Sequence, residues 1–450
     1  MQNKRSTGYL QLLRQNKSFR NLWFGQVVSE LGDWLNSIAI YALILRLSDS
    51  GMAMAGAMMA KLLPIVLISP IAGVVVDRMN RKTVMIVSDL LRFLVVLGFL
   101  FVEDQNTLWF IYALVIIEIS LSGFFEPARS AIIPSLVPKE HLVTANALSG
   151  STWSVMLAFG AALGGIIVSL FGIRVAFIVD AFTFLISAWF ISKVHIGTSP
   201  TKEQAKKNGF EEFMDSMRYL LKKPVVLVLS LLKPGLAVAG GIMTLIPLMA
   251  RQVISKPSML SFGIGVLYSA RGLGAALGPL LVKRFFGETA NVLRWSIATA
   301  FFLKAISYFF IANSENLWAL SFSVAAATFF GSIIWVFSSS LIHLSTPDHY
   351  LGRVFSFELA LMTLVMGISN WGVGFAVDDL GLTSNEVAFW MAGFVALPGL
   401  SWTGFLTLSR KQLQQGECTA STCPIDPSGF NPRPMVREEQ IENKLQSGEK

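Results

Sequence analysis

The sequence is poor in charge. Only 14% of its 450 residues are charged, and its mean hydropathy is +0.59. A soluble domain carries about 25% charged residues, so charge is missing from long segments here. This excludes an ordinary soluble protein and indicates a polytopic integral membrane protein, because apolar spans of about 20 residues cross a bilayer as helices.

Residues that carry catalytic or metal chemistry are also scarce. The two cysteines, Cys418 and Cys423, lie in a polar tail, and two ligands alone do not make a zinc site. The four histidines fall at or near the ends of apolar segments, with neither metal spacing nor a nucleophile–base pattern. A nucleotide-binding loop of the G-x-x-x-x-G-K-[ST] type is absent from the sequence. We therefore expect no enzyme, no metal, no cofactor and no ATP drive within this chain.

What the sequence does contain is a series of twelve apolar segments. They predict an all-α membrane protein of twelve transmembrane helices, over residues 20–46, 53–76, 83–102, 107–128, 142–170, 175–193, 225–250, 261–282, 292–312, 317–344, 353–377 and 387–409. The longest connection divides them six and six. We expect two pseudo-symmetric six-helix bundles at 1–193 and 225–409, a linker with an amphipathic surface helix at 194–224, and a disordered tail at 410–450. A weak internal repeat agrees with this division, since a shift of 205 residues places Gly73 on Gly278.

Basic residues are concentrated in alternate connections. One set of loops holds only Arg46, Arg174, Arg251 and Lys256, whereas the other set and both termini carry most of the rest. By the positive-inside rule, both termini and the 194–224 linker are cytoplasmic. The net charge of +8 therefore reports topology in a bacterial inner membrane, and we expect no nucleic-acid partner.

The first apolar segment carries an unusual polar stripe. In a helix, Gln26, Glu30, Asp33 and Ser37 fall at i, i+4, i+7 and i+11 and share one face. Asp33 lies ~20 Å along a helix that begins near residue 20, close to the middle of a bilayer. A charge there costs at least ~2.5–3.5 kcal/mol, so it needs compensation or a function.

The stretch "GVVVDRMNRK" at 73–82 resembles the loop between helices two and three of the major facilitator superfamily, whose pattern is G-x-x-x-D-R-x-x-R-K. Every fixed position matches: Gly73, Asp77, Arg78, Arg81 and Lys82. The stretches "SELGDW", "FFEPARSAIIPSLVP", "TANAL" and "DAFTFLISA" further resemble the branch that contains macrolide-efflux proteins and the enterobactin exporter.

The resemblance implies the major facilitator fold and a conformational role for this cytoplasmic motif. In the family the motif holds the cytoplasmic side closed and must break for inward opening. We expect Gly73 to allow close helix packing, and Asp77 to pair with Arg129 or with the start of the eleventh span near Gly352 and Arg353. The alternative is that the basic residues only enforce topology.

Two departures from the family pattern bear on proton coupling. The arginine that family antiporters often carry in helix four is replaced by Ile119, next to Glu118, and "GAALGG" at 160–165 lacks the usual proline. These changes do not affect the predicted fold, but they weaken the case for the family's standard proton-antiport mechanism.

The same resemblance implies that spans one, four, seven and ten line the cavity. The candidates for binding a proton or the substrate are then Glu30, Asp33, Glu118, Lys233, Arg271 and Trp335. An Asp33–Lys233 or Glu30–Arg271 pair that only locks the halves is the alternative. Asp89 and Arg92, three residues apart, are expected to pair with each other.

These observations predict a monomeric secondary transporter that exports an amphipathic small molecule, such as a macrolide or a siderophore, by proton antiport with alternating access. A flippase or importer for a lysophospholipid, and a non-transporting receptor or scaffold, remain as alternatives.

Overall fold

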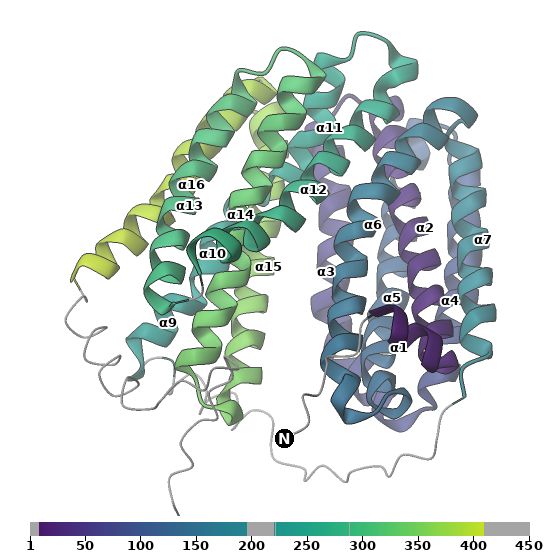
Figure 1. Cartoon of the computed structure of the whole chain (residues 1–450). Helices are drawn as coiled ribbons and strands as arrows, with labels where there is room; N and C mark the ends of the chain where they lie inside the picture. Colours follow the sequence, from purple (N-terminus) through teal and green to yellow (C-terminus); the bar gives the residue numbers. More distant parts are fainter. Residues whose placement is uncertain (1–8, 196–219, 221, 288, 409–450) are drawn as a thin grey trace, which may run out of the picture. The chain divides into compact units, whose positions relative to one another are not determined.

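The computed structural model describes residues 9–195, 220, 222–287 and 289–408, and its regular structure is helical (Figure 1). Twelve of its helical segments are long and apolar enough to cross a membrane, which confirms the predicted number. The predicted surface helix of the linker and the predicted disordered tail lie outside the described residues, apart from the linker's ends.

The first six spans follow a short helix, α1 (Tyr9–Gln15), that the sequence analysis did not predict. They are α2 (Lys17–Leu47), α3 (Gly51–Arg78), α4 (Arg81–Gly98), α5 (Leu108–Leu136), α6 (Leu142–Phe171) and α7 (Ile173–Ser192). Short 3₁₀ turns, η1 (Phe99–Phe101), η2 (Gln105–Thr107) and η3 (Lys139–His141), lie between them. Side-chain caps fix where the helices begin: Asn16 accepts from the Phe19 amide at 2.8 Å, and Asn80 accepts from the Lys82 amide at 3.0 Å.

The last six spans begin with α9 (Pro224–Ser230), α10 (Leu232–Ala237) and α11 (Ile242–Val253), which together form the seventh. They continue through η4 (Pro257–Met259), α12 (Leu260–Phe286), α13 (Ala290–Ala312), α14 (Leu317–Ser345), α15 (Asp348–Asp378) and α16 (Ser384–Leu408). Among the first six spans, the fourth, α5, runs beyond its predicted end at 128 and contains Pro127 and Pro134. Membrane helices tolerate such prolines because neighbouring groups satisfy the freed carbonyls.

The seventh span is broken, where the sequence predicted a continuous helix over 225–250. Pro234 has no amide hydrogen and removes one helical hydrogen bond, and Gly240 and Gly241 lie where α10 gives way to α11. Polar side chains from α15 satisfy the exposed backbone: Ser369 donates to the Val238 carbonyl at 2.6 Å and accepts from the Gly241 amide at 2.9 Å. The break is therefore a stable feature of this structure.

Small residues bring α6 and α12 into close contact. A Cβ added at Gly265 would lie 2.7 Å from the Ala161 carbonyl oxygen and 2.8 Å from the Gly165 Cα, and one at Gly272 would lie 2.6 Å from the Ala158 amide nitrogen. These distances leave no room for a side chain, so α6 and α12 can approach this closely only with glycine at these positions.

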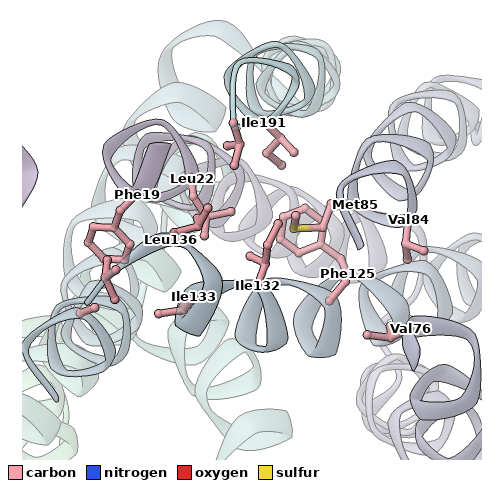
Figure 2. Packing of buried hydrophobic residues seen from close by; sticks show 14 of the residues in the cluster. Phe19, Leu22, Val76, Val84, Met85, Phe125, Ile132, Ile133, Leu136 and Ile191 are labelled. Carbon is pink, nitrogen blue, oxygen red and sulfur yellow. The ribbon is translucent and has the colours of Figure 1, made fainter. Parts of the chain in front are cut away.

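For orientation, we call the end of the spans where α2 joins α3 the 48–50 end, and the opposite end, where α3 joins α4, the 79–80 end. A cluster of buried apolar side chains fills the first six spans toward the 79–80 end (Figure 2). Phe19 and Leu22 of α2 pack there with Met85 of α4, Phe125 of α5 and Ile191 of α7. This cluster packs α2, α4 and α5 together, and the same three helices carry residues of the candidate site.

Candidate functional site

The centre of the site is Arg92 on α4, which is buried between two carboxylates. Its Nη2 lies 2.5 Å from Asp89 Oδ1, and its Nη1 lies 3.8 Å from Asp33 Oδ1 on α2. The guanidinium carbon lies 4.8 Å from the centre of the Phe125 ring and 4.3 Å from that of Phe184. The predicted Asp89–Arg92 pair is confirmed, but Arg92 also reaches the polar stripe, which the sequence analysis did not foresee.

The two carboxylates that share Arg92 differ in exposure. The side chain of Asp89 is fully buried, whereas that of Asp33 is 39% exposed. Asp33 can therefore meet a proton or a ligand, while Asp89 stays with the arginine. This arrangement keeps a buried guanidinium paired when Asp33 changes its charge.

The stripe on α2 extends into a hydrogen-bond network with α5 and α6. Gln26 donates to Glu30 at 2.8 Å and to the Ser149 carbonyl at 2.9 Å, and its own carbonyl accepts from Arg129 at 2.8 Å. Arg129 also pairs with Glu126 at 2.5 Å. Arg129, one of the two partners expected for Asp77, is thus held by Gln26 and Glu126 in this structure, and its pairing with Asp77 stays a prediction.

A polar cavity of about 460 Å³ opens beside this network, between α2, α5 and α6. Its ionisable lining residues are Glu30, Asp33, Glu126 and Arg129, and Trp153 supplies an exposed aromatic face. Three carboxylates against one guanidinium favour a positively charged ligand. Most of its lining is polar, and Ile133 and Trp153 are its large apolar side chains.

Glu118 lies outside the cavity lining and is buried. Both of its carboxylate oxygens accept from the Asn36 amide, at 2.8 and 2.9 Å. Lys61 donates to Ser37 at 2.6 Å and lies 5.0 Å from the centre of the Tyr41 ring. Glu118 of α5 is thus hydrogen-bonded to Asn36 of α2, the helix that carries the polar stripe.

The basic candidates of the last six spans do not meet the stripe. Lys233 pairs with Glu358 of α15 at 2.7 Å, and its ammonium lies 4.9 Å from the Trp335 ring centre and 5.3 Å from that of Phe355. The Asp33–Lys233 pair, one of the alternatives from the sequence, is therefore not formed in this structure. Glu358 was missed, although it is an ionisable residue inside a predicted span and that signal alone would have found it.

Arg271 likewise does not pair with Glu30. Its guanidinium carbon lies 5.8 Å from the centre of the Tyr268 ring, which in turn stacks on Tyr41 with centres 5.4 Å apart. Lys304, buried on α13, donates to the Ala327 carbonyl at 3.0 Å. Lys233, Arg271 and Lys304 thus all have contacts within the last six spans.

In this structure the last two residues of the 73–82 motif are bonded to neighbouring helices, whereas Asp77 and Arg78 are exposed to the surface. Arg81 donates to the Ala131 carbonyl of α5 at 2.7 Å, and Lys82 donates to the carbonyls of Ser192 and Val194 at 2.6 and 2.9 Å. Nothing lies within 4 Å of a Cβ added at Gly73 or at Gly352, so the predicted close packing at Gly73 is absent here. The guanidinium carbon of Arg353 lies 5.9 Å from the centre of the Tyr350 ring.

Comparison with known proteins gives the family. A family model described as "Transmembrane secretion effector" matches residues 8–407. The chain is 26% identical to an uncharacterised transporter of the major facilitator type, YfiS of Bacillus subtilis, over 90% of this chain and 95% of that one. It is 24% identical to macrolide efflux protein A of Streptococcus pyogenes, over 81% and 90% of the two chains. It is 26% identical to the enterobactin exporter EntS of Salmonella choleraesuis, over 77% and 82%.

Solved structures agree on the fold. The peptide transporter PepTSo, of the POT family, superposes with a TM-score of 0.68 at 11% identity, covering 88% of this chain and 99% of that one. The chain is a multi-pass bacterial membrane protein, and its family members are transporters of small molecules. It belongs to the transmembrane secretion effector family of the major facilitator superfamily.

Proposed function

We propose that the protein exports an amphipathic organic cation in exchange for protons, as a monomer in the bacterial inner membrane. The observation that carries this proposal is the position of Asp33. It lines an acidic cavity and contacts an arginine that a second, buried carboxylate already holds. A group so placed can bind either a proton or a ligand cation while the arginine beneath it stays paired.

The exchange follows from this competition. With the cavity open to the cytoplasm, an arriving cation favours the ionised form of Asp33, so the proton bound to that carboxyl leaves, and Glu30 and Glu126 add negative charge beside the cation. After the cavity turns to the other side, protons return and the cation is released. Charge on the cavity wall thus couples the two fluxes, with Asp33 as the exchanging group and Arg92 as its fixed counter-charge.

The pairing of Lys233 with Glu358 argues against an anionic cargo. The sequence leaves a siderophore open as cargo, but Lys233, a basic candidate for binding an anionic one, is neutralised by a buried carboxylate. The names of two relatives, a macrolide efflux protein and an enterobactin exporter, support export of an organic molecule without deciding its charge. The acidic surplus of the cavity favours the cation.

The direction of opening follows from the charge pattern. If the basic loops are cytoplasmic, the 79–80 end and both termini face the cytoplasm. Hydrogen bonds join the two halves of the chain at the 48–50 end, whereas Asp77 is exposed at the other. These observations support an inward-facing state, which alternates with an outward-facing one during transport.

The test is uptake of radiolabelled tetraphenylphosphonium into inside-out membrane vesicles that carry an acidic interior. We expect the pH gradient to drive uptake in wild type and not in Asp33→Asn, at equal amounts of protein in the membrane. Glu103→Gln is the matched control, because Glu103 is exposed and pairs with Arg174, which is exposed as well. A scaffold would move no cation in any sample, and a lipid flippase would move a fluorescent lysophospholipid instead.

A further inference from the structure

At the 48–50 end, a carboxylate of α15 caps the first turn of α3. Asp378, the last residue of α15, accepts from the Gly51 amide at 2.7 Å, from the Met52 amide at 2.9 Å and from the Ser50 hydroxyl. The first amides of a helix have no partner within the helix, and its N-terminus carries a partial positive charge. A single carboxylate from the last six spans therefore satisfies the start of a helix in the first six.

The surrounding residues hold this contact close. A Cβ added at Gly374 would lie 2.9 Å from Ala55 Cβ and 3.0 Å from the Gly51 carbonyl oxygen. Nearby, Arg251 of α11 pairs with Asp49 at 2.5 Å and donates to the Leu45 carbonyl at 3.0 Å. Two independent polar contacts thus join the 45–52 segment to the last six spans.

The same two helices carry the corresponding groups at the 79–80 end, where they are apart. α3 and α15 pack against each other and run in opposite directions, because the start of α3 meets the end of α15. Asp77 lies next to last in α3, as Asp378 lies last in α15. Asp77 is exposed, and open space surrounds Gly352 in the first turns of α15. Each helix therefore ends in a carboxylate that can cap the start of the other.

We propose that Asp378 is a latch that closes the 48–50 end, as the counterpart of the role that the family resemblance implies for Asp77 at the 79–80 end. Capping of α3 by Asp378 stabilises the state seen here, and capping of α15 by Asp77 stabilises the opposite state. The two contacts exclude each other, because α3 and α15 cannot be drawn together at both ends while a cavity is open at one. The free energy of two caps of one kind then nearly cancels, which leaves the equilibrium free to respond to cargo and protons.

This inference goes beyond the proposed function and does not depend on the cargo, so its test needs no substrate. Cys418 and Cys423 are replaced by serine, and spin labels are attached through cysteines at two pairs of exposed positions. The pair Asn106 and Glu315 reports on the 48–50 end, and the pair Glu140 and Arg284 reports on the 79–80 end. Pulsed electron spin resonance then gives the distance distribution at each end in detergent and in lipid nanodiscs.

We expect Asp378→Ala to lengthen the first distance and shorten the second, with a population shift of about five- to tenfold, as for loss of a helix cap. Asp77→Ala should shift neither distribution away from the wild-type state, and the double variant should return toward wild type. Asp379→Ala is the matched control, a neighbouring exposed carboxylate for which the structure gives no side-chain contact among its described residues.

The proposal is overturned if Asp378→Ala gives the same two distributions as Asp379→Ala. If Asp378→Ala does not yield a monodisperse protein, Asp378→Asn and Ser50→Ala replace it. Asp378→Asn keeps one acceptor oxygen but loses the charge, and Ser50→Ala removes the hydroxyl donor. Both should shift the distances in the same direction by a smaller factor, and no shift in either contradicts the latch.

Discussion

Arg92 Nη1 lies 3.8 Å from Asp33 Oδ1, although the two residues are on different helices and are 59 positions apart in the sequence. The same guanidinium is held by Asp89 at 2.5 Å. Asp33 is the partly exposed partner of this buried arginine, which fits the exchange that we propose for it.

Asp33→Asn should abolish proton-driven transport while leaving the protein folded. Asp33 is partly exposed, and Arg92 keeps Asp89 when the charge of Asp33 is removed. We expect the rate of pH-driven uptake to fall by roughly tenfold or more with little change in melting temperature. Equal uptake in Asp33→Asn and Glu103→Gln vesicles would exclude Asp33 as the coupling group.

Asp89→Asn should destabilise the protein far more than Asp33→Asn. It leaves the buried guanidinium with only a 3.8 Å contact, and breaking a buried ion pair from one side costs about 3–5 kcal/mol in proteins. Thermal unfolding of the purified variants, followed by intrinsic fluorescence, measures the difference. Similar melting temperatures for the two variants would mean that Arg92 is not held mainly by Asp89.

Glu126→Gln should weaken binding of a monovalent amphipathic cation without removing proton coupling. Glu126 lines the cavity and is exposed, but it does not contact Arg92. Loss of one carboxylate beside a bound cation should raise its Kd about tenfold, equivalent to ~1.4 kcal/mol. Binding of tetraphenylphosphonium to the detergent-solubilised protein, measured by equilibrium dialysis, checks this. An unchanged Kd would place the cation elsewhere.

Lys233 and Glu358 should behave as a structural pair. Both are buried, so Lys233→Met or Glu358→Leu alone leaves one uncompensated charge among Trp335 and Phe355. Each single variant should lose stability by about 3–5 kcal/mol, and the double variant should recover most of the loss.

Thermal unfolding of the two single variants and the double variant gives the interaction energy of this pair. Additive losses would mean that the two side chains do not stabilise each other. Recovery of stability without recovery of transport would add a functional role to the structural one.

Much of the fold was predictable because lipid leaves so few choices. Long apolar segments must be helices, and basic loops mark one side, so the twelve spans follow from composition alone. The break in the seventh span was not predicted, although Pro234, Gly240 and Gly241 in "LLKPGLAVAGG" at 231–241 are signals for one. Its stability depends on Ser369 and Asn370 of α15, far away in the sequence.

The residues of the polar face could be predicted from the sequence, but their partners on other helices could not. The spacing of Gln26, Glu30 and Asp33 predicted a polar face, and the structure lines a cavity with part of it. The partner of that face could not be read from spacing, because Arg92 looked satisfied by Asp89 within its own helix. Contacts between helices decide which charges are shared, and a single sequence does not encode them in any local pattern.

The most direct measurement of the exchange is proton release from the purified, detergent-solubilised protein in weak buffer when tetraphenylphosphonium or a macrolide is added. Wild type should release protons as the cation binds, and Asp33→Asn should release none while Glu103→Gln behaves as wild type. Binding without release in wild type, or equal release from Asp33→Asn, would contradict proton–cation exchange at Asp33.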